Sequence, residues 1–428
     1  MKWLASFLLV FTAQIVVAQQ DTAFTQLSLK QAIEIARERN PSINMLRQQI
    51  EQKHAQFFQG IGVSDPEITF MKEGIKRDTN RGYSEKRWTI SQYIDFPLTS
   101  YFRMDKIAEE ERMLRQRLKA ACLYLKANIK SQYTELIYTL EIVHLRKEQL
   151  KLSNRLYNSA LLRLEAGEAS ELELMKADIQ KAESQNDLDE ANRLMHVARY
   201  NLFRVIGMDP EKQRYDIHFP DSLKYIDVDV DQEKALHTLE MQPEYLSFTH
   251  KLNSASSGVK EAWSSFLPNL NFSYYVEDFG SGMDYYGYEV GFSFPLWFPF
   301  NQSKYIQQAK ANRRSVEWQQ RDIFLEMKRQ VEIAWHSYEK SKKTIKRFHE
   351  RVRVKAAKLR DLTMDGYAAG EVDLLTLLEA QRTYLGTEKR YFDALREYYL
   401  RIIELEKFLQ TDLIFNKEDL SCPELKTD

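Results

Sequence analysis

Proline and glycine are scarce in this 428-residue sequence, which holds 10 prolines and 14 glycines. Two long stretches, residues 98–209 and 300–422, contain no proline at all. Each follows a Phe-Pro-Leu triplet, at residues 96–98 and 294–296. Because proline inside a helix removes a backbone hydrogen bond and clashes with the preceding turn, the two stretches predict exceptionally long helical segments.

An excess of basic charge is missing as well. The chain has 61 Lys and Arg against 62 Asp and Glu, a net charge of −1, which argues against nucleic acid as a partner because phosphate binding needs a basic surface. The eight histidines form no close pair at metal-ligand spacing, and no phosphate loop is present. We therefore expect no enzyme activity, no cofactor and no metal site.

Cysteine is nearly absent, with only Cys122 and Cys422. The sequence leaves a disulfide between them open in an exported protein, but no pattern favours one, and we expect both to be structural bystanders. Export itself is predicted by residues 1–18: Lys2 precedes an apolar run that ends in a small-residue cleavage site, the pattern of a signal peptide. The alternative is a retained anchor, although the run is short for a bilayer.

What the chain does have is an internal repeat. A glycine-marked break at Gly167 recurs at Gly370, and a constant offset of 203 positions pairs apolar residues beyond it. The pairs are Leu172 with Leu375, Leu174 with Leu377, Ala177 with Ala380, Ala191 with Ala394, and Leu202 with Leu405. Such a constant offset indicates duplication. We predict a first repeat over 24–210, a linker over 211–232, a second repeat over 233–415 and a polar tail over 416–428.

The long segments carry a narrow apolar seam. In the first repeat Ile129, Leu136, Val143, Leu150 and Tyr157 are seven residues apart, and in the second Tyr391, Leu395, Tyr398, Ile402, Leu405 and Leu409 step by fours and threes. This spacing favours packing against neighbouring helices along their full length. The first helix, expected over 99–164, would be about 95 Å long. Such a helix is better suited to one element of an oligomeric assembly than to a globular core.

Short alternating segments lie between the helices, at 66–73, 87–96, 269–276 and 288–294. Their apolar faces carry Trp88, Phe272, Tyr274, Phe292 and Phe294, whereas the opposite faces are polar. This period of two is typical of outer-membrane β-strands; an ordinary soluble hairpin is the alternative. Four strands cannot close a barrel, and an open edge cannot lie in lipid, so the membrane interpretation requires a homo-oligomer.

These features together resemble the TolC-like outer membrane efflux proteins, most closely the CzcC-like branch. The two glycine turns, at residues 166–172 and 367–375, and the repeated Phe-Pro-Leu triplet carry the resemblance. It implies a mainly α-helical fold with a transmembrane β-barrel contribution: a homotrimer whose four strands per chain form one twelve-stranded barrel in the outer membrane, above a periplasmic helical tube. It also implies two partners, a periplasmic adaptor and an inner-membrane pump of the resistance-nodulation-division type, often for metal cations.

Functional residues are expected at the periplasmic tip of the tube. We predict adaptor docking at Arg163, Leu164, Ala166, Gly167, Tyr367, Ala369 and Gly370. The resemblance also implies a gate of inward acidic residues at Glu173 and Glu379, although Thr376 stands where the family pattern has another acid. The predicted function is a passive exit duct for efflux. The alternatives are a duct for type I protein secretion or for drugs, and an exported coiled-coil scaffold without a pore.

Overall fold

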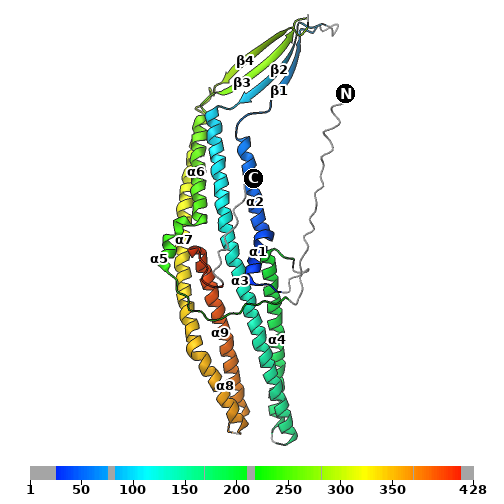
Figure 1. Ribbon diagram of the computed structural model, residues 1–428, viewed down its shortest axis with the longest axis vertical. Coiled ribbons are helices and arrows are strands. Elements are labelled where there is room, and N and C mark those ends of the chain that lie inside the picture. The colour runs from blue at the N-terminus through cyan, green and yellow to red at the C-terminus, as the bar shows by residue number, and fades with distance from the viewer. Residues whose placement is uncertain are drawn as a thin grey trace.

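The computed structural model describes residues 26–75, 82–167, 169–209, 217–280, 282–369 and 371–415. The expected signal peptide, the polar tail, part of the linker and Gly370 lie outside these ranges. The described chain is long and narrow, with a small sheet at one end and two helical hairpins at the other (Figure 1). No helix within the described ranges is both long enough and apolar enough to cross a membrane.

The first half begins with two short helices and ends with two long ones. Its elements are α1 (Leu29–Arg39), α2 (Pro41–Gln59), β1 (Glu67–Glu73), β2 (Glu85–Ile94), α3 (Pro97–Glu165) and α4 (Glu171–Ile206). The 69 residues of α3 span about 100 Å at 1.5 Å per residue. Pro97 occupies the first helical position, where its missing N–H costs no hydrogen bond. The predicted helix over 99–164 is thus confirmed.

The second half repeats this order, except that a π-helical segment divides its first long helix in two. Its elements are α5 (Gln232–His237), the 3₁₀ turn η2 (Leu239–Met241), α6 (Pro243–Ser264), β3 (Asn269–Asp278), β4 (Tyr285–Ser293), α7 (Gln302–Arg347), the π-helical segment η3 (Phe348–Val352), α8 (Arg353–Ala368) and α9 (Leu374–Leu409). Helices α4 and α9 are each 36 residues long, and their bounds differ by the same 203 positions as the sequence repeat.

The four strands form one antiparallel sheet in the order β1-β2-β3-β4. The central pairing of β2 with β3 joins the two halves, with Trp88 opposite Val276 and Ile90 opposite Tyr274. Strand β1 adds Phe70 opposite Trp88. This register places the apolar residues of all four strands on a single face, so the alternation in the sequence predicts both the strands and their shared face correctly.

The main hydrophobic core lies at mid-length, where α1, α3, α4, α7 and α9 meet the linker. Described linker residues 217–231 form no helix or strand, yet tyrosine hydroxyls bind their backbone. Tyr398 donates to the Ile226 carbonyl at 3.0 Å, and Tyr399 donates to the Lys224 carbonyl at 2.8 Å. Leu223 and Val228 are buried in the core. This part of the linker is therefore a strap fixed across the helices rather than a loose connection.

The predicted seams are largely confirmed. Five residues of the second seam, from Leu395 to Leu409, are buried, and so is Tyr391. In the first seam Ile129, Leu136 and Val143 are buried, whereas Leu150 and Tyr157 are only half-buried. Towards the tip the contact passes instead to small and polar residues, which pack closely because they carry little bulk. These are Gln149, Ser153 and Ala160 on α3, with Ala177, Ser184 and Ala191 on α4.

The structure decides the redox state of Cys122, which the sequence leaves open. This residue, on α3, is disulfide-bonded, and the described residues include no free cysteine. The other cysteine of the sequence, Cys422, lies outside the described ranges. No cysteine pattern in the sequence favours a disulfide, so the sequence alone does not predict this bond.

Candidate functional site

The apolar face of the sheet is uncovered. Its exposed side chains are Ile68 and Phe70 on β1, Trp88 and Ile90 on β2, Phe272 and Tyr274 on β3, and Tyr286, Tyr288, Val290 and Phe292 on β4. None of the described helices packs on the sheet, which extends beyond the ends of α3 and α6 (Figure 1). Soluble monomers rarely expose contiguous apolar patches of this extent, so this face requires an apolar environment outside the single chain.

The opposite face of the sheet is polar and internally bonded. Ser91 and Ser273 face each other across β2 and β3, with their hydroxyls 3.0 Å apart. Arg87 forms an ion pair with Glu277 at 2.6 Å, and its guanidinium lies 4.9 Å from the centre of the Tyr275 ring. That ring covers Gly287 of β4, where any added Cβ would lie 2.3 Å from it. The two faces thus suit two different surroundings, one apolar and one aqueous.

Both edges of the sheet are unpaired. Within the described residues β1 hydrogen-bonds only to β2, and β4 only to β3. An open edge presents a row of unsatisfied N–H and C=O groups, which cannot be tolerated in lipid. Within the described residues, both edges of the sheet are therefore open to pairing with further strands.

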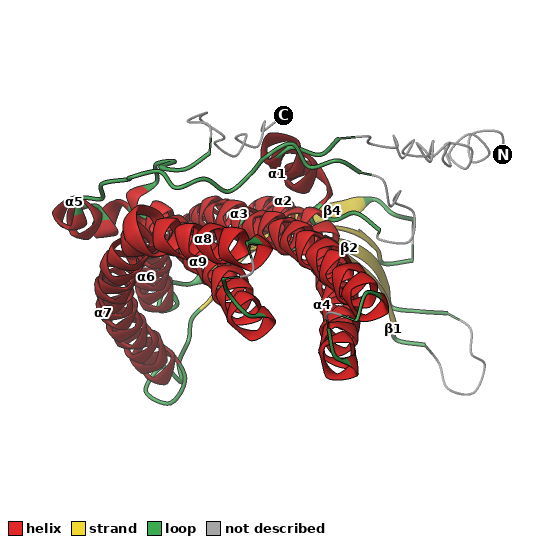
Figure 2. Cartoon of the chain, turned by 90° about the horizontal axis from the view of Figure 1, so that it is seen from below, coloured by secondary structure: helices red, strands yellow, loops and turns green. Residues whose placement is uncertain are grey.

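The helices show the same incompleteness. Seen along the long axis, α7, α6, α3 and α4 lie side by side in an arc, with the strap and α1 on its outer side (Figure 2). Contacts run from each helix to the next, α6 with α7, α3 with α6, and α3 with α4. The described helices thus form an open arc within the single chain (Figure 2).

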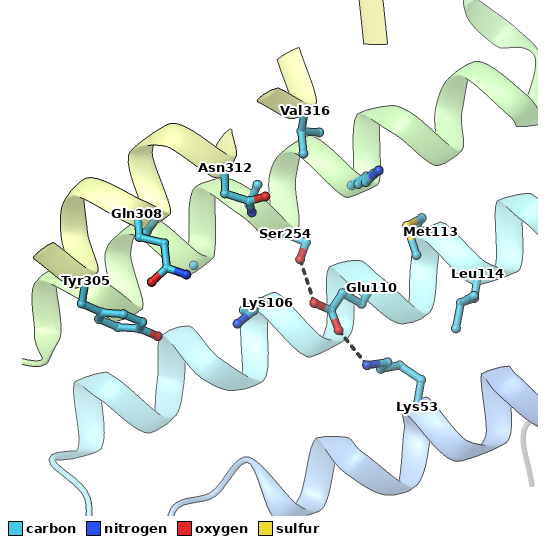
Figure 3. Close-up of a pocket in the computed structure, with 14 residues that line it drawn as sticks. Lys53, Lys106, Glu110, Met113, Leu114, Ser254, Tyr305, Gln308, Asn312 and Val316 are labelled. Atoms are coloured by element: carbon cyan, nitrogen blue, oxygen red, sulfur yellow. Dashed lines mark hydrogen bonds and ion pairs between the residues drawn. The ribbon is translucent and has the colours of Figure 1, made fainter. Parts of the chain in front are cut away.

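A cavity of about 460 Å³ lies between α2, α3, α6 and α7, near the sheet end (Figure 3). Its charged groups already have partners: Lys53 pairs with Glu110 at 2.7 Å, and Ser254 donates to Glu110 at 3.3 Å. Lys106 pairs with Glu261 at 3.3 Å. The cavity therefore presents packing and paired charge, not an arrangement for catalysis.

At the opposite end, each hairpin turns through a capped break. The hydroxyl of Ser170 accepts the backbone N–H of Glu173 at 3.3 Å, and the carboxylate of Asp373 accepts that of Thr376 at 3.0 Å. Both are N-caps that satisfy free amides at a helix start. Gly167 has φ of 76°, a left-handed conformation that glycine adopts without a Cβ penalty.

The structure brings together two of the residues predicted for the tip. Arg163, near the end of α3, donates to the Tyr367 hydroxyl of α8 at 2.8 Å, and its guanidinium lies 5.7 Å from the centre of that ring. Of the other predicted tip residues, Ala166, Gly167 and Ala369 are exposed, Leu164 is half-buried, and Gly370 lies outside the described residues. The contact joins the two hairpin ends into one surface.

The predicted gate residues lie on the second helices of the two different hairpins. Glu173 lies in the first turn of α4 and is half-buried, whereas Glu379 lies further along α9 and is exposed. Thr376 occupies the position on α9 that Glu173 occupies on α4, three residues after the cap. Within this chain, the described residues contain no cluster of three groups suited to a metal ion.

Sequence inspection missed a buried charge network beside the core. Lys130 on α3 pairs with Glu406 and with Asp412, each at 2.6 Å, and Glu406 also accepts the backbone N–H of Leu413 at 2.6 Å. Burial raises the pKa of Glu406, and the neighbouring Lys130 opposes this shift. The network fixes the chain after α9 against α3. In the sequence, the only indication of this network is that Lys130 directly follows a residue of the first apolar seam.

Comparison with known proteins fits this geometry. Residues 237–409 match the profile of the family described as outer membrane efflux protein. This part of the chain is therefore similar to outer membrane efflux proteins. It contains α6, β3, β4, α7, α8 and α9, and hence half of the sheet and one complete hairpin. The resemblance to the TolC-like family is confirmed, whereas the CzcC-like branch stays a prediction.

Solved structures extend the likeness of fold beyond residues 237–409. The Campylobacter jejuni CmeC outer membrane channel is 17% identical, with 89% of this chain and 85% of that chain covered and a TM-score of 0.74. VceC, an outer membrane protein from Vibrio cholerae, is 16% identical, with 89% and 95% covered and a TM-score of 0.74. The open state of the Neisseria gonorrhoeae MtrE outer membrane channel is 17% identical, with 90% and 89% covered and a TM-score of 0.71.

These likenesses show that both repeats share the fold of outer membrane channels. No curated protein sequence matches the chain. The efflux protein family and the similar structures are channels rather than enzymes, which confirms the expectation that this chain is not an enzyme.

Proposed function

We propose that this protein is the outer membrane exit duct of a tripartite efflux system. The observation that carries the proposal is the four-stranded sheet, with one exposed apolar face and two unpaired edges, at the end of helices about 100 Å long. Such a sheet needs lipid on one face and further strands at both edges. A protein built this way would connect a membrane, at the sheet, with a partner at the far end of the helices.

A homotrimer satisfies these needs. Three copies would place β1 of one chain beside β4 of the next and close a twelve-stranded barrel, which leaves no edge in lipid. The apolar face, with Trp88 and Phe292, would contact lipid, and the polar face, with Ser91 and Arg87, would line water. The three helical arcs would meet as a tube in the periplasm.

The hairpin tips are the proposed docking site for a periplasmic adaptor. Ala166, Gly167 and Ala369 are exposed there, and the contact between Arg163 and Tyr367 couples the two turns. An adaptor that bound either hairpin would therefore act on both. We also propose that Glu173 and Glu379, multiplied by the trimer, form carboxylate rings that attract cations and repel anions.

The duct would supply a path, and its partner, an inner-membrane pump of the resistance-nodulation-division type, would supply energy. The resemblance to the CzcC-like branch implies metal cations as cargo. A deletion strain tests this: we expect sensitivity to metal salts that a plasmid copy of the gene restores. Sensitivity to organic drugs alone would assign the duct to drug efflux, and loss of a secreted protein would assign it to secretion.

A tip variant separates docking from assembly. Arg163→Ala removes the bond to Tyr367 and leaves the buried residues of the seam unchanged, so we expect normal trimers in the outer membrane and reduced resistance. Arg193→Ala is a matched control, because Arg193 pairs only with Glu190 of its own helix among the described contacts and exposed pairs contribute little. Full resistance with Arg163→Ala would contradict docking through the coupled tips.

A further inference from the structure

The cavity between α2, α3, α6 and α7 opens on the concave side of the helical arc. Lys53 of α2 and Tyr305 of α7 both line it, and the four helices pack as consecutive neighbours, α2 with α3, α3 with α6 and α6 with α7. Side chains from the two ends of such a row meet on the side towards which the row curves, whereas on the other side they point apart. The strap and α1 lie on the outer side of the arc (Figure 2), so the cavity faces away from them.

The floor of the cavity is apolar. Leu114 of α3, Ala255 of α6 and Val316 of α7 line it and are buried. Gly258 of α6 lines it as well, and a Cβ added there would meet no atom of the neighbouring helices closer than 3.7 Å. Close packing of the helices therefore does not require this glycine, although glycine is unfavourable inside a helix. Its effect is to leave the cavity, which measures about 460 Å³, open to an apolar group.

The wall formed by α7 supplies hydrogen-bonding groups. Tyr305, Gln308 and Asn312 follow one another at a spacing of three and four residues, which places them on one face of the helix, and all three line the cavity (Figure 3). They are exposed, and among the described contacts none of their side chains has a hydrogen-bond partner. From Tyr305 to Val316 the wall is about 16 Å long at 1.5 Å per residue. It can therefore follow an extended molecule while it binds polar groups.

One lysine of the cavity has no carboxylate partner. The other two form the ion pairs with Glu110 and Glu261 described above, whereas Lys251 of α6 donates to the neutral amide oxygen of Gln319 at 2.6 Å and forms no ion pair within the described residues. Lys251 is half-buried; burial lowers its pKa, and the positive charge of Arg117 on α3 lowers it further. Arg117 has no ion pair among the described contacts either. Charges removed from water are normally paired, so two neighbouring cations without an acid leave a place for an anion.

We propose that the cavity binds an acidic amphiphile, with its carboxylate at Lys251 and its apolar body extended over the floor towards Tyr305. Helices α6 and α7 run in opposite directions (Figure 1), and Lys251 bonds to Gln319, one turn beyond Val316. The head and the end of the body would thus lie at opposite ends of the α7 wall. The proposal rests on the proposed function in one respect, since cargo reaches the cavity only if the concave side of the arc faces the lumen. Uncompensated positive charge does not suit a metal cation, so the site adds acidic amphiphiles to the cargo of the duct.

The test is photo-crosslinking on the full chain, reconstituted in vesicles of phosphatidylcholine. One probe is dodecanoic acid with a diazirine near its methyl end, and the matched probe is dodecanol with the diazirine at the same carbon. Mass spectrometry of peptides locates each crosslink. Both probes dissolve in the bilayer and should label the sheet near Phe292 alike. The acid should label the peptides around Gly258 and Tyr305 about tenfold more than the alcohol, since a hydrogen bond to a charged group contributes about that factor.

Three variants locate the head and the body of the ligand. Lys251→Gln should lower labelling of the cavity by the acid to the level of the alcohol, whereas Lys260→Gln, at an exposed lysine of the same helix, should leave it unchanged. Gly258→Leu fills the cavity, keeps every charge and suits a helix, so it should abolish labelling there by both probes. Native mass spectrometry checks that each variant assembles as the natural chain does.

Equal labelling of the cavity by the acid and the alcohol, or an equal loss with Lys251→Gln and Lys260→Gln, would overturn the acidic head. A labelled sheet with an unlabelled cavity would overturn the site, and so would cavity labelling that survives Gly258→Leu, because the probe would then bind elsewhere. Failure of either probe to label the sheet would contradict the duct instead, since Phe292 would then not lie in lipid.

Discussion

The two helical hairpins of this chain descend from one repeat but are built differently. In the first, α3 is uninterrupted, and towards the tip it meets α4 through small residues such as Ser184 and Ala191. In the second, α7 and α8 are separated by the π segment Phe348–Val352, and α9 packs through large residues such as Tyr391 and Leu395. Helices α4 and α9 are therefore equal in length but pack differently, α4 through small residues and α9 through large ones.

The π segment lies where the linker strap crosses. The ring of His349 lies 4.9 Å from Tyr225 of the strap and 6.2 Å from Tyr391 of α9. A π turn widens a helix and shifts the direction of the side chains that follow it. The first hairpin also meets the strap, where the Tyr133 hydroxyl of α3 donates to Asp221 at 2.5 Å, yet α3 keeps a regular helix. The strap therefore contacts both hairpins, but only the second contains a π segment.

The largest effect should come from a charge placed in the large-residue seam. Leu395 is fully buried, and Leu395→Asp removes its packing and buries an unpaired carboxylate. Loss of a buried leucine alone costs about 2–5 kcal/mol, and the charge adds to this. We expect no stable trimer, measured by native mass spectrometry and by the unfolding midpoint in detergent. Leu405→Asp, at another fully buried seam position, should do the same.

The matched control lies at the equivalent position of the first hairpin, which is Asn192. Asn192→Asp introduces the same carboxylate at a half-buried site, where water and relaxation reduce its cost. It should assemble almost normally. A normal trimer from both leucine variants, or equal damage from Asn192→Asp, would remove the distinction between the seams.

Replacing alanine by leucine should destabilise the first hairpin more than the second, which is the opposite order to that expected for the charge substitutions. Ala191 is buried in the small-residue seam, so Ala191→Leu forces α3 and α4 apart, at about 1–3 kcal/mol for an overpacked core. Ala394 is its counterpart on α9 and is only half-buried, so Ala394→Leu should cost less than about 1 kcal/mol. Urea unfolding followed by helical circular dichroism measures both. Equal losses would show that the two seams tolerate volume alike.

A smaller effect is expected at the turn of the first hairpin. Gly167 has φ of 76°, and no heavy atom lies within 4 Å of the place its Cβ would take. Gly167→Ala therefore tests backbone strain alone and should destabilise the protein by about 1 kcal/mol. Gly258→Ala, inside helix α6, is the control with opposite sign, because alanine favours a helix by a similar amount. Thermal unfolding that moves both variants in one direction would contradict this account.

The sequence predicts the regular parts of this molecule well, because they depend on local patterns. The absence of proline predicts α3, and strict alternation predicts the shared face of Trp88 and Phe272. It predicts poorly what depends on residues far apart. The strap bound by Tyr398, the disulfide of Cys122 and the contact of Arg163 with Tyr367 leave no periodic signal. At the tip, sequence spacing selects the right turns but cannot show that the two turns touch.

The smallest predicted difference concerns the caps of the two second helices. Ser170, which caps α4, cannot titrate in the acidic range, whereas Asp373, which caps α9, can. Hydrogen bonds from Thr376 hold the pKa of Asp373 below its ordinary value of 3.8. Because this pKa is lower in the folded than in the unfolded chain, the cap stabilises α9 above about pH 4 and is lost as pH falls through the folded-state value.

Hydrogen exchange at pH 5 and pH 3, corrected for intrinsic rates, should therefore show lost protection at the amide of Thr376 on α9 but none at that of Glu173 on α4. Asp373→Ser gives α9 the cap of α4 and should remove the dependence on pH. If both amides lost protection together, acid would be loosening the coupled tips as a unit, through the contact between Arg163 and Tyr367. The hairpins would then differ in their seams but act as one body at the docking surface.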